Sequence, residues 1–167
     1  MAVSRWTELP GRLARELLRE LRGLRGTERL AVIGAAIMAG SLLLPWYDAS
    51  VEDLVQTGLG GFSFAEGAML LTCAATVFLS LRVGGGYVPP RPLKEWALFV
   101  AAGTWAGLIV VYRMIDRPEL DFDLAIVEIQ RDYELGYGIF VALAGALIIV
   151  AAGLRSRRGE RAARRAG

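Results

Sequence analysis

The sequence predicts an all-α membrane protein: a four-helix transmembrane bundle with both ends of the chain in the cytoplasm. Three observations lead to this prediction, namely four long apolar stretches, loops whose charge alternates in sign, and aromatic residues at the ends of the stretches. The 167 residues are 54% hydrophobic, with a mean hydropathy of +0.43, which is high for a soluble protein of this size. A chain of this length normally forms one domain.

The apolar stretches occupy residues 30–47, 62–81, 96–112 and 135–154. Each falls within the roughly 17 to 25 residues that a membrane-spanning helix needs. Backbone polar groups cannot stay unpaired in lipid, and the stretches lack the alternation of barrel strands, so helices are expected. The predicted bundle therefore covers residues 30–155.

Charge predicts the orientation. Residues 1–29 contain seven Arg and four Glu, the segment from Arg82 to Glu95 is basic, and the tail 156–167 is strongly basic. The two remaining loops are acidic. The positive-inside rule therefore places both termini in the cytoplasm. Lys94 is the only lysine, a bias typical of GC-rich bacterial genomes, so a multi-pass protein of the bacterial cytoplasmic (inner) membrane is expected. The span ends carry an aromatic belt: Trp46, Tyr47, Phe62, Trp96, Tyr112 and Tyr137.

The segment 1–29 predicts an amphipathic cytoplasmic helix. One side carries Leu13, Leu17, Leu21 and Leu24, and the opposite side carries Arg12, Arg15, Arg19 and Arg22. Such a helix can lie among the headgroups with its arginines near anionic lipid. The alternative is packing against the cytoplasmic end of the bundle. The basic tail is expected to contact anionic lipid rather than nucleic acid.

Glu66 lies about one turn inside the second stretch, where a carboxylate is costly unless it is paired or reached by water. Arg113, at the same end of the third stretch, is the expected partner. Three interpretations remain open: an ion or ligand contact at the outer mouth of the bundle, a structural ion pair, or a carboxylate that reaches water alone.

The long acidic loop offers a weak metal site. Carboxylates of Asp116, Glu119, Asp121 and Asp123 could bind a divalent cation such as calcium, although EF-hand spacing is absent. An ordinary solvated loop is the alternative. The chain contains no histidine and one cysteine, Cys73, so a Cys/His metal site is excluded, and neither a cofactor nor enzymatic activity is expected.

Small residues recur at the spacing that lets helices approach closely in lipid. The predicted packing residues are Gly103 and Gly107 in the third stretch, and Gly138 and Ala142 in the fourth. They serve either packing within one bundle or association with another chain.

Several short motifs resemble those of uncharacterised small four-span membrane proteins of GC-rich bacteria. The motifs are Leu-Leu-Pro-Trp-Tyr at 43–47, Gly-Gly-Phe-Ser-Phe-x-Glu at 60–66, Val-Val-Tyr-Arg at 110–113 and Gly-Tyr-Gly at 136–138. The resemblance implies that Pro45, Trp46, Glu66, Arg113 and Gly138 form one cluster on the external side. Tyr47 and Tyr137 are added to it as candidate binding residues.

These observations favour a non-enzymatic accessory or assembly subunit that binds lipid and a membrane protein partner. The alternative is a small oligomeric channel or transporter component whose acidic loops concentrate cations at its mouth.

Overall fold

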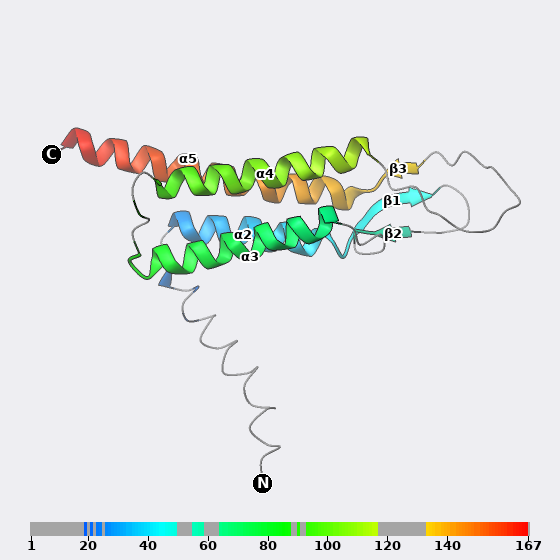
Figure 1. Cartoon of the computed structure of the whole chain (residues 1–167), viewed down its shortest axis with the longest axis horizontal. Coiled ribbons are helices and arrows are strands. Elements are labelled where there is room, and N and C mark those ends of the chain that lie inside the picture. Colours follow the sequence, from blue (N-terminus) through cyan, green and yellow to red (C-terminus); the bar gives the residue numbers. More distant parts are fainter. Residues whose placement is uncertain are drawn as a thin grey trace, which may run out of the picture.

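The computed structural model describes residues 19, 21, 23–24, 26–49, 55–58, 64–87, 90, 93–116 and 133–166. Within them are four long helices: α2 (Gly26–Ser41), α3 (Phe64–Gly84), α4 (Glu95–Ile115) and α5 (Tyr137–Ala166). The helices lie along the long axis of the molecule, and a small sheet sits at one end of them (Figure 1). Of the predicted amphipathic helix at 1–29, most residues lie outside the described part of the chain.

Three helices are long and apolar enough to cross a membrane: α3, α4 and α5. This agrees with the prediction of a multi-pass membrane protein. The fourth predicted span, 30–47, is shorter in the structure, because α2 has 16 residues and spans only about 24 Å at 1.5 Å per residue. The basic tail is helical, since α5 continues without a break to Ala166.

The prediction that a helix continues to Tyr47 was wrong. Helix α2 ends at Ser41, and Pro45–Ala49 forms strand β1. Proline lacks an amide hydrogen and disfavours a helical conformation in the residue before it. The last helical turn instead tightens, because the amides of Leu42, Leu43 and Leu44 each bond to the carbonyl three residues earlier.

A three-stranded antiparallel sheet follows from this break, and the sequence had not predicted it. Strand β1 is central, flanked by β2 (Val55–Thr57) and β3 (Tyr133–Leu135). Tyr47 pairs with Leu135 of β3 and with Gln56 of β2, and the register shifts between Pro45 and Tyr47 on the β2 side. Leu135, expected in the fourth span, therefore belongs to the sheet.

Helix α5 is the centre of the bundle and packs mainly against α2 and α4. At its crossing with α2, a side chain on Gly145 would meet the Gly34 carbonyl oxygen at 2.7 Å. At its crossing with α4, a side chain on Gly103 would meet the Val150 amide nitrogen at 2.8 Å. Both crossings therefore require glycine, because backbone lies where a side chain would go.

The four predicted packing residues do not all lie at close contacts between helices. Gly103 makes the expected close approach, and Ala142 is fully buried in the main core. Gly107 does not, because a methyl group there would lie 3.9 Å from Ala146, an ordinary contact. Gly138 packs against strand β1 rather than against a helix. The packing residues predicted from the sequence did not include Gly34 and Gly145.

Candidate functional site

The candidate site is a buried cluster where the sheet meets the helices. Helices α3 and α4 are antiparallel, so the first turn of α3 and the last turn of α4 lie at the same end of the bundle. Glu66 lies in the first of these turns and Arg113 in the second. The helix dipoles favour this arrangement, because an acid is stabilised at a helix N-terminus and a base at a C-terminus.

Glu66 and Arg113 form the ion pair that the sequence predicted. The Arg113 side chain donates to the Glu66 Oε1 atom from both Nε, at 2.8 Å, and Nη2, at 2.5 Å. The two residues are only 3% and 6% exposed. Glu66 is therefore held by a buried guanidinium, and the interpretation as a carboxylate reaching water alone is wrong.

Tyr47 connects the sheet to the end of α4 that carries Arg113. Its hydroxyl donates a 2.8 Å hydrogen bond to the backbone carbonyl of Arg113. That carbonyl belongs to the last turn of α4. One tyrosine thus links the central strand to the end of α4, directly beside the charged side chains.

Trp46 makes a second connection, between the sheet and the end of α2. Its indole nitrogen donates at 2.7 Å to the carbonyl of Ser41 at the end of α2, which also accepts a hydrogen bond from the Leu44 amide. The ring is buried against Gly138, where a side chain would meet the indole Cδ1 atom at 2.7 Å. The Gly136 amide donates to the Trp46 carbonyl at 2.8 Å. The predicted cluster of Pro45, Trp46 and Gly138 is therefore a packing joint between β1 and the start of α5.

Tyr137 does not join the cluster. It is 60% exposed, so its role as a binding residue alongside Trp46 and Glu66 has no support from its position. The reason is helical geometry: Gly138 and Ile139 face the bundle, which turns Tyr137 outward.

The metal prediction concerns mainly residues outside the described part of the chain, namely Glu119, Asp121 and Asp123. Asp116 is described: it is exposed, its amide donates to the Tyr112 carbonyl at 2.7 Å, and its carboxylate accepts a hydrogen bond from the Tyr112 hydroxyl. Asp116 thus closes the end of α4. Among the described residues, no group of three or more His, Cys, Asp or Glu side chains is placed to hold a metal ion.

Comparison of the chain with protein-family models, curated proteins and solved structures found no match. The resemblance to small bacterial four-span proteins therefore stays a prediction.

Proposed function

We propose that this chain is a non-enzymatic accessory or assembly subunit of a bacterial cytoplasmic membrane, which binds lipid and a membrane protein partner. The observation that carries the proposal is the set of contacts that attach the sheet to the helices. The Glu66–Arg113 ion pair is buried, and Tyr47 and Trp46 bond to the adjacent helix ends. The sheet is thereby held rigidly on the bundle, as suits a surface that a partner recognises.

The proposed arrangement has four spans. Helix α2 is short, but it packs along α5 and touches it at Gly34 and Gly145. Since α5 is long enough to cross a bilayer, a helix that packs closely against it lies in the same layer. The three-residue turn after Ser41 adds length to α2 before the sheet begins.

The proposed orientation has the sheet outside and both termini in the cytoplasm, with the part of residues 1–29 that precedes α2 lying in the interface. Its support is the gathering of basic residues at the end of the bundle opposite the sheet. Arg82 lies in the last turn of α3, Lys94 precedes α4, and the extension of α5 carries six arginines. The positive-inside rule assigns such an end to the cytoplasm.

A role in binding rather than in chemistry is supported by the use of Glu66. Its carboxylate oxygen Oε1 already accepts two hydrogen bonds from Arg113, so the carboxylate is used within the chain to hold α3 and α4 together. Within one chain, large side chains such as Met38, Met69 and Ile149 fill the space between the helices. The alternative, a channel, therefore requires a pore between several copies.

Purification from native membranes in mild detergent tests the proposal. We expect one membrane protein to accompany the chain in stoichiometric amount, and to be lost when Glu119, Asp121 and Asp123 of the acidic loop are changed to amides. A matched variant at the other end, Arg155→Gln with Arg158→Gln, is expected to retain it. A symmetric homo-oligomer without a partner would favour the channel, and a lone monomer would contradict both functions.

A further inference from the structure

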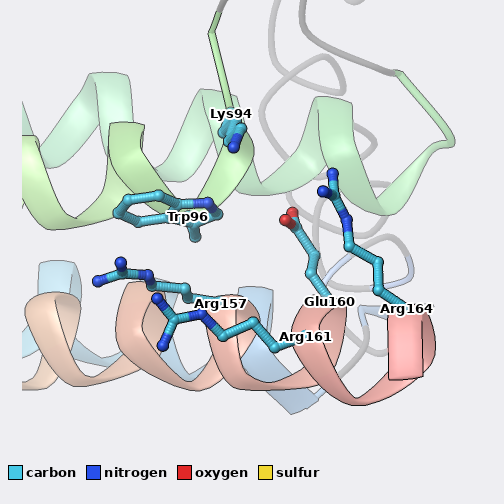
Figure 2. A pocket seen from close by; sticks show the side chains of 6 residues that line it. All are labelled: Lys94, Trp96, Arg157, Glu160, Arg161 and Arg164. Carbon is cyan, nitrogen blue, oxygen red and sulfur yellow. The ribbon is translucent and has the colours of Figure 1, made fainter. Parts of the chain in front are cut away.

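A basic cavity lies at the end of the bundle opposite the sheet. Its volume is about 130 Å³, several times the roughly 30 Å³ that one water molecule occupies in the liquid. Four cationic side chains and one carboxylate line it together with a tryptophan: Lys94, Arg157, Arg161 and Arg164, then Glu160, then Trp96. Figure 2 shows the side chains of α5 beside Trp96 and Lys94 at the start of α4. Positive charge therefore predominates in the cavity.

The close packing of α4 and α5 creates this cavity. A side chain on Gly153 would meet the Trp96 carbonyl oxygen at 2.7 Å, so the backbone of α5 lies directly against the first turn of α4. Helix α5 then continues for more than three turns, which brings its arginines beside that turn. The Ser156 hydroxyl also donates to Glu95 Oε1 at 3.4 Å.

Trp96 positions one of the cations. The guanidinium of Arg157 lies 4.6 Å from the centre of the Trp96 ring, within the range of a cation–π interaction. The side chain is thereby held at the cavity while its N–H groups remain in the plane of the guanidinium. Such planar donors suit the oxygens of a phosphate group, which arginine can bind with two hydrogen bonds.

The N-terminus of α4 adds to the same field. Lys94 is the N-cap residue, and its side chain makes no capping hydrogen bond. The first turn of a helix carries the positive end of the helix dipole. Backbone and side chains thus both favour an anion, with the cationic side chains supplying most of the charge.

We propose that this cavity binds the phosphate group of an anionic phospholipid. This inference rests on the proposed membrane arrangement, in which Trp96 begins a span and the cavity lies at headgroup depth. A zwitterionic headgroup is disfavoured, because its own cation would face four others. A soluble phosphate compound offers the same chemistry and is the other possible source of the ligand.

Ligand-induced stabilisation of the full chain in an uncharged detergent tests the proposal, because a ligand that binds only the folded state raises its stability with concentration. The probes are dioctanoyl phosphatidylglycerol, dioctanoyl phosphatidylcholine and inorganic phosphate. The test variant is Arg157→Gln with Arg161→Gln. The matched control is Arg155→Gln with Arg158→Gln, which removes the same charge from the same helix outside the cavity.

We expect phosphatidylglycerol to bind more tightly than phosphatidylcholine, with its apparent Kd raised at least about tenfold in the test variant and less than about twofold in the control. Inorganic phosphate that competes at equal affinity would assign the site to a soluble phosphate compound. Equal weakening in both variants, or no preference over phosphatidylcholine, overturns the proposal. Circular dichroism of each variant checks folding, and partner co-purification is read separately, so the two proposals can fail independently.

Discussion

Replacing Glu66 by methionine removes one member of the buried ion pair, so the Arg113 guanidinium loses the Glu66 carboxylate while it stays only 6% exposed. Two hydrogen bonds to Oε1 are lost, at 2.8 and 2.5 Å. Removing one partner of a buried ion pair costs about 3–5 kcal/mol of folding free energy. Arg113→Met, which removes the other partner, is expected to cost about the same. The carbonyl that Tyr47 contacts belongs to the backbone, so that bond is expected to survive.

The double variant Glu66→Met with Arg113→Met is the informative comparison. Replacing a buried ion pair by apolar side chains of similar size is often neutral or stabilising, so its cost is expected to fall below that of either single variant. Reversible unfolding in detergent–SDS mixtures, followed by circular dichroism, measures all three. Arg158→Gln is the exposed control outside the basic cavity and is expected to change stability by less than about 0.5 kcal/mol. Single-variant costs that simply add in the double variant would refute the coupling.

Four further variants test the orientation of the ion pair, the crossing of α4 and α5, and the hydrogen bond of Tyr47. Exchanging the charges, Glu66→Arg with Arg113→Glu, is expected to restore only part of the lost folding free energy. Each charge then lies at the unfavourable end of its helix dipole, which costs about 0.3–1 kcal/mol per charge. Complete rescue in the same unfolding assay, or no rescue, would contradict this expectation. Gly103→Ala is expected to cost about 1–3 kcal/mol, because its methyl group would meet backbone atoms of α5, while Gly107→Ala has room and is tolerated; equal losses would contradict the crossing. Tyr47→Phe removes one hydrogen bond to the Arg113 carbonyl and is expected to lower the free energy of unfolding by about 1 kcal/mol. Amide hydrogen exchange in the sheet is expected to become faster. An unchanged exchange rate would contradict the role of Tyr47 in attaching the sheet to α4.

The helices and the ion pair could be predicted because their signals are local or set by topology. Apolar length marks α3, α4 and α5, and an antiparallel order brings the ends that carry Glu66 and Arg113 together. Neither step requires knowledge of how the helices rotate against one another.

The sheet and the exact crossings could not be predicted in the same way. The run of leucines before Pro45 continues the apolar pattern of α2, so hydropathy alone does not reveal that the helix ends at Ser41. Strand β1 also pairs with residues almost 90 positions later, and short strands leave little periodicity. Gly103 and Gly107 have the same spacing signal, yet only the rotation of α4 against α5 decides which one the crossing needs.

The orientation of the bundle is tested most directly by cysteine accessibility in intact cells. Replacing Cys73 by alanine leaves a background without cysteine, into which Asp116→Cys at the sheet end or Ala162→Cys at the basic end is introduced. Both positions are exposed. We expect a membrane-impermeant maleimide to label position 116 in intact cells and position 162 only after permeabilisation. Labelling of both positions in intact cells, or the reverse pattern, would contradict the arrangement with the sheet outside and the basic end in the cytoplasm.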